Sequence, residues 1–286
     1  MADSSETHKV ALRAARAAAR IHLKWLSRTS VTRKTNPIDL VTEADQQAEA
    51  SVIEILQRAF PTHAVLAEES GANAHTSEHR WIIDPLDGTT NFAHGYPQFC
   101  VSIAYEYRGK VRVAIILDAF KKECFVAQRG RGAHLNGKPI RVSLVPTLEL
   151  SLLATGFPYD RRERRRYYLA FWEEFMMRVQ GVRRTGSAAL DLAYVACGRT
   201  DGFWEFGLKP WDVAAGALIV EEAGGCVTNM DGSRLDLAGA QLIASNGRLH
   251  EQIMGVLDSA RPEAERRHAE MLRTMAASPA ATVSPK

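Results

Sequence analysis

Apolar residues recur every three or four positions along the first part of the chain. Over residues 8–26 they face away from a row of Arg and Lys, which predicts an amphipathic packing helix. A second helical pattern runs over residues 45–60, and Pro61 is expected to end it. Asp45 is therefore predicted to lie near the start of the second helix.

Shorter, strand-like runs follow these two helices. Residues 65–67 form one such run, which ends at Glu68 and Glu69, and residues 81–83 form another after a polar connection. Between residues 100 and 142 consecutive strand-like runs are separated by glycine turns. This succession of short strands and tight turns favours an antiparallel sheet.

A second half of the chain is predicted to begin near residue 146. The elements expected there are a strand at 150–155, helices at 167–179 and 188–197, a strand at 201–205 and a helix at 213–223. After residue 258 the composition shifts to Arg, Glu and Ala and then to Ser, Pro and Ala, typical of a helical extension and a disordered tail. We predict one catalytic domain over 6–257, with two halves, and an extension over 258–286.

The composition is that of an ordinary globular protein. Of its 286 residues 46% are hydrophobic and 24% charged, and a net charge of +3 is too small to indicate a nucleic-acid partner by itself. Apolar runs are shorter than a membrane span, and the acidic N-terminus lacks the apolar core of a secretory signal. We therefore expect no membrane association.

The cysteines indicate a reducing compartment. They are scattered without C-x-x-C spacing, which suits buried thiols in a cytoplasmic protein better than disulfides or a zinc site. The set comprises Cys100, Cys124, Cys197 and Cys226.

The segment W-I-I-D-P-L-D-G-T-T-N-F over residues 81–92 is the most informative stretch. Asp84 follows three apolar residues, Pro85 is expected to stop the strand, and Asp87 lies near enough to share cations with Asp84. Gly88 and Thr89 would then present backbone N–H groups to an anion, particularly if a helix starts at Thr89. The segment thus predicts a metal and phosphate site. A type I turn capped by Asp is the alternative that these residues alone leave open.

Three further acidic motifs accompany this segment. They are D-L-V-T-E-A-D at 39–45, Glu68-Glu69, and W-D-V-A-A-G, which contains Asp212. Together, in this order, the motifs over residues 10–257 resemble the inositol monophosphatase family of lithium-sensitive, Mg²⁺-dependent phosphatases. The resemblance implies a layered α/β fold, an αβαβα sandwich with mixed and antiparallel sheets, where periodicity alone indicates only mixed α/β.

The resemblance also implies a set of metal ligands. Glu68, Asp84 and the Leu86 carbonyl would hold a first Mg²⁺, and Asp84, Asp87 and Asp212 a second. A third, weaker ion would rest on Glu68 through waters. Cations offset the repulsion between gathered carboxylates and can stabilise both the attacking and the leaving oxygens of a displacement.

A water molecule activated by these cations would be the nucleophile. Thr89, hydrogen-bonded to Asp45, and the Glu68 carboxylate are the candidates to orient and deprotonate it. From the residues alone, Thr89 and Asp45 could each be helix caps. Glu69 is interpreted as a support for the ligands or a salt-bridge partner.

The polyol side of the site follows from the resemblance as well. The implied contacts are the Ala188 amide, Glu205 and Asp212, together with Asp87, while Glu68, Gly88 and Thr89 would bind the phosphate side. Where several family members carry a serine-rich loop, this chain has T-G-F-P-Y over 155–159. The resemblance therefore does not extend to contacts on the far side of the ring.

Basic residues offer two further hypotheses. Lys34 resembles a family lysine near the phosphate approach, with a solvated loop lysine as the alternative. The run R-R-E-R-R-R over 161–166 could bind nucleic acid or an acidic partner, although a solvated face or steering of an anionic substrate is favoured.

The sequence thus predicts a phosphatase that releases myo-inositol and orthophosphate from inositol monophosphate. The T-N-F sequence over 90–92 looks like the inositol branch of the superfamily. The alternatives are a broader sugar or nucleotide phosphatase, acting for example on fructose 1,6-bisphosphate or histidinol phosphate, and a second, non-catalytic role with transcription machinery. We also expect a homodimer.

Overall fold

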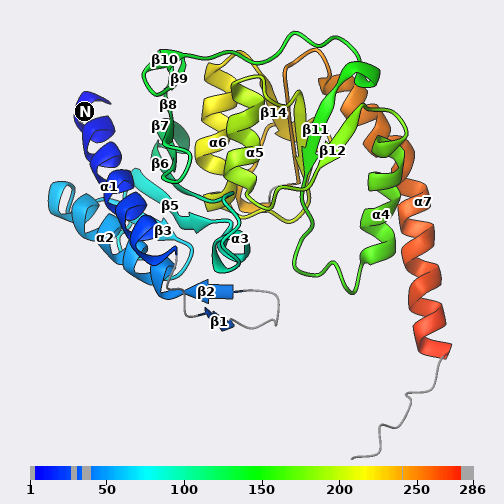
Figure 1. Ribbon diagram of the computed structural model, residues 1–286, viewed down its shortest axis with the longest axis horizontal. Coiled ribbons are helices and arrows are strands. Elements are labelled where there is room, and N and C mark those ends of the chain that lie inside the picture. Colours follow the sequence, from blue (N-terminus) through cyan, green and yellow to red (C-terminus); the bar gives the residue numbers. More distant parts are fainter. Residues whose placement is uncertain (1–3, 27–30, 34–39, 240, 278–286) are drawn as a thin grey trace, which may run out of the picture.

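The structure is a computed structural model that describes residues 4–26, 31–33, 40–239 and 241–277. Figure 1 shows five layers in the order helix pair, sheet, helix pair, sheet, helix pair. This arrangement confirms the αβαβα sandwich. Within the described ranges no helix is long and apolar enough to span a membrane.

The first sheet has the strand order β10-β9-β8-β7-β6-β5-β3-β4, and its strands pair antiparallel except for β3 with β5. This confirms the antiparallel sheet predicted over 100–142. The strands are β3 (Ala64–Ala67), β4 (Gly71–Ala72), β5 (His79–Asp87), β6 (Cys100–Tyr107), β7 (Lys110–Asp118), β8 (Glu123–Gln128), β9 (Ala133–Leu135) and β10 (Lys138–Pro139).

Helices α1 (Ser4–Trp25) and α2 (Glu43–Ala59) cover the outer face of this sheet. Their apolar stripes pack on it in one cluster that includes Val52, Leu56 and Ile83. Both helices agree with the prediction from periodicity, because each has one apolar stripe and one charged face. A two-stranded ribbon, β1 (Val31–Arg33) and β2 (Leu40–Thr42), precedes α2.

The second sheet has the order β12-β11-β13-β15-β14. Strand β11 (Leu152–Thr155) runs parallel to β12 (Gly181–Arg183) and to β13 (Gly202–Glu205). Strand β15 (Leu242–Ser245) pairs antiparallel with β13 and with β14 (Cys226–Asn229). The 3₁₀ turns η1 (Leu148–Leu150) and η2 (Leu237–Gly239) lie in this half.

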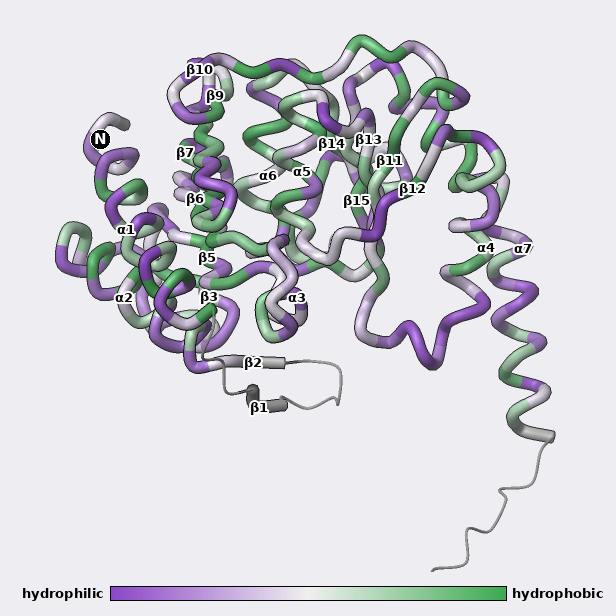
Figure 2. The backbone as a smooth tube through the Cα atoms, viewed as in Figure 1, coloured by the Kyte–Doolittle hydropathy of each residue, from purple (hydrophilic) through white to green (hydrophobic). Residues whose placement is uncertain are grey.

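Helices α5 (Ala188–Ala196) and α6 (Pro210–Glu222) fill the space between the two sheets. Nearly every residue of α5 and the run from Val213 to Val220 are buried, because each helix has a sheet on both sides. Figure 2 shows the resulting hydrophobic colouring on both helices.

The outer layer of the second half consists of α4 (Arg165–Met176) and α7 (His250–Ala277). Helix α7 starts before the predicted extension and continues through Pro262. Ala260, Ala264 and Met271 are buried, so the described part of the extension packs on the body. The predicted tail over 278–286 lies outside the described residues.

One expectation about β5 is wrong. Pro85 does not stop the strand, which runs through Asp87. Asp84 pairs with Ser102 and Asp87 with Cys100, and the register shifts between them, so β5 carries one extra residue there. A proline fits such a bulge because a ladder hydrogen bond is not required of its nitrogen.

Candidate active site

A single pocket of about 550 Å³ collects the acidic residues of both halves. The first half contributes residues from the ends of β3 and β5 and the start of α3 (Thr89–Ala93). The second half contributes residues from the ends of β11 and β13 and the starts of α5 and α6. The predicted lining residues are Glu68, Asp84, Leu86, Asp87, Gly88, Thr89, Ala188, Glu205 and Asp212.

The bulge in β5 places Asp84 and Asp87 at the pocket floor. Asp84 is 2% exposed, and its Oδ1 accepts a hydrogen bond from the Leu86 amide at 2.9 Å. The Pro85 carbonyl accepts a hydrogen bond from His22 Nε2 at 2.8 Å, which ties the bulge to α1. The bulge is therefore held by one hydrogen bond within β5 and by another from α1.

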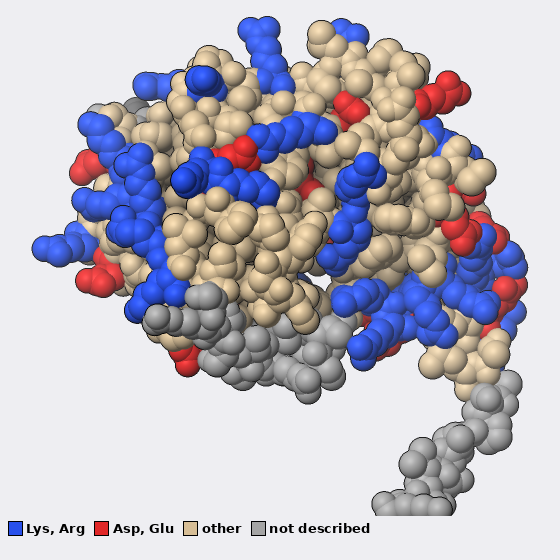
Figure 3. All heavy atoms as spheres, in the orientation of Figure 1, with Lys and Arg blue, Asp and Glu red and all other residues tan. Residues whose placement is uncertain are grey.

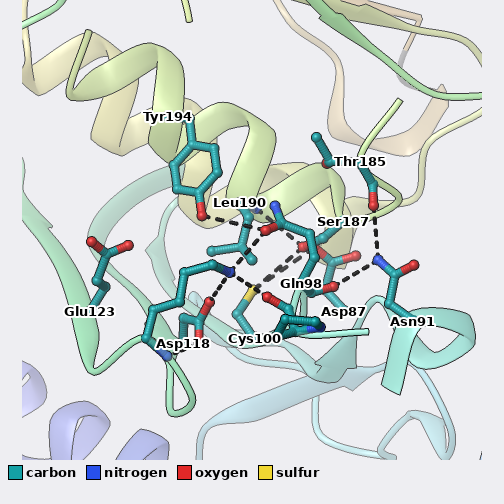
Figure 4. A network of polar contacts seen from close by, with 12 residues as sticks. Asp87, Asn91, Gln98, Cys100, Asp118, Glu123, Thr185, Ser187, Leu190 and Tyr194 are labelled. Carbon is teal, nitrogen blue, oxygen red and sulfur yellow. Dashed lines mark hydrogen bonds and ion pairs between the residues drawn. The ribbon is translucent and has the colours of Figure 1, made fainter. Parts of the chain in front are cut away.

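Asp87 is bound by the second half of the chain. Its Oδ2 accepts hydrogen bonds from the Ser187 hydroxyl at 2.6 Å and the Ala189 amide at 2.8 Å. Figure 4 shows this contact beside Asn91, whose side-chain amide donates to the Thr185 and Gln98 carbonyls. The G-S-A turn over residues 186–188 thus fixes Asp87. This role of Ser187 was not predicted from the sequence. Its only signal is a serine directly before an apolar helix, the usual N-cap pattern.

Asp45 and Thr89 are joined as predicted. The Thr89 hydroxyl lies 2.9 Å from both Asp45 Oδ1 and the Leu86 carbonyl oxygen. Asp45 Oδ2 accepts from the amide and the hydroxyl of Thr42, which is the N-cap of α2. Burial raises the pKa of Asp45 to about 6, although these hydrogen bonds oppose the rise. Gly88, not Thr89, is the N-cap of α3.

Gly88 is required by its surroundings. Its φ of +92° is in the left-handed region, and a Cβ there would lie 2.7 Å from the Gln98 carbonyl oxygen. The glycine therefore lets the chain turn tightly between the bulge and α3, which keeps the amides after Asp87 at the pocket.

The pocket carboxylates repel one another. The pKa of Asp84 is raised well above its usual value by burial and then by the charges of Glu68, Asp87 and Asp212. Burial, followed by the charge of Asp87, does the same to the pKa of Asp212. The donors in this pocket are oxygen atoms, which are the ligands that a hard divalent cation prefers. The positive charge of such a cation would offset the repulsion between the carboxylates.

Within the described residues, no three His, Cys, Asp or Glu side chains are already arranged to hold a metal ion. Mg²⁺ does not need such a cage, because it keeps several waters and binds through one or two carboxylates plus substrate oxygens. The oxygen donors of this pocket therefore fit Mg²⁺ better than a metal that requires a preformed set of nitrogen or sulfur ligands.

Glu205, the last residue of β13, lines the same pocket. Burial raises its pKa to about 8, with contributions from the charges of Asp191 and Asp87, while Arg184 opposes the rise. Asp191 is buried and accepts a hydrogen bond from the Thr185 hydroxyl at 2.7 Å. Arg184 and Asp191 were not predicted, since neither belongs to an acidic motif.

The remaining predicted residues lie around this centre. The Glu69 amide donates to Glu49 Oε2 at 2.8 Å, and the Ser70 amide donates to Glu49 Oε1, so Glu49 shapes the turn after Glu68. The Glu68 amide donates to the Ile83 carbonyl at 3.1 Å. Lys34 lies outside the described residues.

The basic run has two environments. Arg161 lines the pocket, whereas Arg162, Arg165 and Arg166 are exposed where the chain enters α4. Figure 3 shows Lys and Arg side chains gathered at the lower right of the molecule, where the chain enters α4 in Figure 1. These positions suit attraction of an anion toward the pocket.

Comparison with known proteins agrees with this geometry. The model of the inositol monophosphatase family matches residues 3–261. The chain belongs to the inositol monophosphatase family. It is 47% identical over 242 residues to the inositol-1-monophosphatase of Synechocystis sp., covering 84% of each chain. It is 43% identical over 265 residues to the Nus factor SuhB of Pseudomonas aeruginosa, covering 90% of this chain and 98% of the relative.

Solved family structures share the fold. The inositol monophosphatase from Anabaena (Nostoc) sp. has a TM-score of 0.82 and 46% identity, covering 89% of this chain and 96% of that one. An IMPase/NADP phosphatase complexed with Mg²⁺ and phosphate has a TM-score of 0.79 and 28% identity, covering 89% and 95%.

Proposed function

We propose that this protein hydrolyses inositol monophosphate to myo-inositol and orthophosphate with Mg²⁺. The observation that carries the proposal is the burial of Asp84 close to the charges of Glu68, Asp87 and Asp212, which line the same pocket. Such a cluster favours cations, and Mg²⁺ binds in proteins through one or two carboxylates together with substrate phosphate oxygens.

Two to three Mg²⁺ ions would be held by Glu68, Asp84, Asp87, Asp212 and the Leu86 carbonyl. When bound, divalent cations acidify water and stabilise the attacking and leaving oxygens of phosphate hydrolysis. The amides of Gly88 and Thr89 would donate hydrogen bonds to the phosphate, since the left-handed Gly88 turn keeps them at the pocket.

Thr89 and Asp45 would orient the attacking water and take up its proton. The Thr89 hydroxyl donates to Asp45 Oδ1, so its oxygen keeps lone pairs that can accept a hydrogen bond from water. Because burial raises the pKa of Asp45 to about 6, its carboxylate is a stronger base than an exposed aspartate and is still largely ionised at neutral pH. Glu68, which lines the same pocket, would assist.

The polyol would lie between Glu205 and Asp212. Carboxyl oxygens accept hydrogen bonds from vicinal hydroxyls, and Ala188 lines the same pocket. Other sugar, polyol or nucleotide monophosphates could use the same phosphate contacts, so these remain the alternative substrates.

A second, non-catalytic role with transcription machinery is favoured by one observation. A relative that covers nearly the whole chain is named a Nus factor. Homodimer formation is a further proposal, and the unpaired cysteines suit the cytoplasm. A pull-down with transcription proteins, run beside a phosphatase assay on the same preparation, tests whether both roles belong to one protein.

The main test is a substrate panel with Mg²⁺. It comprises inositol 1-phosphate, fructose 1,6-bisphosphate, histidinol phosphate, a nucleoside monophosphate and an aryl phosphate, each measured as kcat/KM. We expect the highest value for inositol 1-phosphate. A higher value for any other member would replace inositol phosphate as the substrate, and no hydrolysis of any would refute the phosphatase proposal.

A further inference from the structure

Gly156 and Glu205 lie side by side at the ends of two parallel strands. Thr155, the last residue of β11, is in register with Trp204 of β13, so Gly156 is the next neighbour of Glu205. The Thr155 hydroxyl also donates to the Trp204 carbonyl at 2.6 Å, which locks this register. Register partners on parallel strands direct their side chains to the same face.

The Glu205 carboxyl group occupies the place of a side chain at position 156. A Cβ built on Gly156 would fall well inside contact distance of Oε1, Oε2 and Cδ of Glu205, which are its three nearest atoms. The missing side chain thus provides the space in which the carboxyl group lies.

The conformation of Gly156 does not explain the glycine. Its φ lies outside the left-handed region that favours glycine, whereas Gly88 and Gly186 have φ of +92° and +87°. The three atoms nearest to a Cβ at residue 156 all belong to the Glu205 carboxyl group. That group is the far end of a flexible side chain, so the fold would tolerate the substitution by moving it.

The Glu205 carboxyl group is close enough to Arg184 and Asp191 for their charges to act on it. Besides burial, which raises the pKa of this carboxyl group, Arg184 lowers it and Asp191 raises it. Gly156, Glu205, Arg184 and Asp191 all line the pocket. A shift of the carboxyl group away from residue 156 would therefore change what the pocket presents to a substrate.

We propose that Gly156 is a positioning residue that sets selectivity for polyol phosphates by leaving room for the Glu205 carboxyl group. The inference rests on the proposed function, because it assumes that Glu205 contacts substrate hydroxyls. A Cβ at residue 156 would displace the carboxyl group by at least about 1 Å, enough to break a hydrogen bond.

The kinetic test is a double-mutant cycle of Gly156→Ala and Glu205→Ala. Inositol 1-phosphate and an aryl phosphate are compared by kcat/KM, and their ratio cancels general damage. We expect Gly156→Ala to lower the ratio roughly tenfold or more, and to have no further effect once Glu205 is alanine. Independent, multiplying effects of the two substitutions, or an unchanged ratio in Gly156→Ala, would overturn the proposal.

Gly255→Ala is the matched control. Gly255 is exposed on α7, and a Cβ there would meet nothing within 4 Å. Both substitutions add one methyl group to a glycine without left-handed φ, but only Gly156→Ala is expected to change the ratio.

A crystal structure of Gly156→Ala separates this inference from the proposed function. We expect an intact β11–β13 register with the Glu205 carboxyl group displaced, whatever the enzyme hydrolyses. A carboxyl group that stays in place would refute the positioning role. If the wild-type protein does not hydrolyse inositol phosphate but the carboxyl group moves, the proposed substrate fails while the contact between the two residues stands.

Discussion

The Ser187 hydroxyl donates a hydrogen bond to Asp87 Oδ2 at 2.6 Å, across 100 positions of the sequence (Figure 4). Ser187 is also the N-cap of α5, with its hydroxyl oxygen 3.4 Å from the Leu190 amide. One side chain therefore fixes both the start of a central helix and the direction of a proposed metal ligand.

Ser187→Ala should weaken Mg²⁺ binding more than it destabilises the fold. We expect a loss of about 1–2 kcal/mol in the free energy of unfolding and a Mg²⁺ requirement raised roughly tenfold to a hundredfold. Ser151→Ala is the control, because Ser151 is buried and donates to the Leu148 carbonyl at 2.7 Å outside the pocket. Equal Mg²⁺ requirements in the two variants would contradict the positioning of Asp87 by Ser187.

Asp84→Asn should nearly abolish turnover while leaving the fold intact. The amide keeps the shape of the side chain but removes the charge that both proposed metals share. It also removes the repulsion with Glu68, Asp87 and Asp212, so the metal-free protein should be no less stable. Mg²⁺ should raise the melting temperature of the wild type but not of the variant.

Asp258→Asn serves as the comparison for that experiment, because Asp258 lies on α7 and its carboxylate is 64% exposed. It should keep both activity and the Mg²⁺-dependent rise in melting temperature. Near-normal turnover in Asp84→Asn with Mg²⁺ would refute the shared-metal assignment.

Lithium should inhibit the enzyme. A small monovalent cation can occupy an oxygen-lined site that Mg²⁺ has left, but it supplies half the charge. The measurement is turnover at millimolar lithium with Mg²⁺ below saturation. Activity that does not change under these conditions would show that the pocket lacks the lithium-sensitive arrangement.

Much of the fold could be predicted from local patterns. Helices α1, α2, α5 and α6 have long periodic or wholly apolar stretches, and the acidic motifs stand directly at element ends. Strands β14 and β15 were missed, because four-residue runs such as Leu242–Ser245 give too little periodicity to identify. The start of α7 at His250 was missed as well.

The contacts between distant residues could not be predicted. Whether β5 continues beyond Pro85 depends on its pairing with β6, which local sequence does not encode. Likewise, nothing near Gly156 indicates that the Glu205 carboxyl group lies over it. The motifs could therefore identify the proposed ligands, but not the residues that position them.

Acid should destabilise the fold through His63. Burial, with the neighbouring charge of His79, lowers the pKa of His63 to about 4, from 6.5 in the unfolded chain. Between these values the unfolded state binds more protons, so the stability present above pH 6.5 is lost as pH falls toward 4. The expected loss is up to about 2 kcal/mol after allowance for solvent screening.

His63→Gln isolates this effect. His63 stacks between Phe60 and His79 and accepts a hydrogen bond from Trp81 Nε1 at 3.1 Å, which a glutamine oxygen can also accept. The variant should be less stable at pH 8 but should lose less stability between pH 6.5 and 4 in denaturant titrations. Parallel curves for the two proteins would assign the acid sensitivity to other groups.

Glu205→Gln separates an inositol phosphatase from a general one. If the Glu205 carboxylate accepts a hydrogen bond from a ring hydroxyl, glutamine keeps the shape but loses a charge-assisted bond of about 1.5–3 kcal/mol. Cations bound beside Asp87 would offset the charge that helps to raise the pKa of Glu205, and would favour its ionised form. The kcat/KM for inositol 1-phosphate should therefore fall roughly tenfold to a hundredfold.

An aryl phosphate, which has no hydroxyl at that position, should be affected much less. The ratio of the two kcat/KM values is the informative quantity, since it cancels any loss of active enzyme. An equal fall for both substrates would mean that Glu205 acts on the metals or on the fold. If neither substrate changed, Glu205 would not touch the substrate, and selectivity for inositol phosphate would have to come from another side of the pocket.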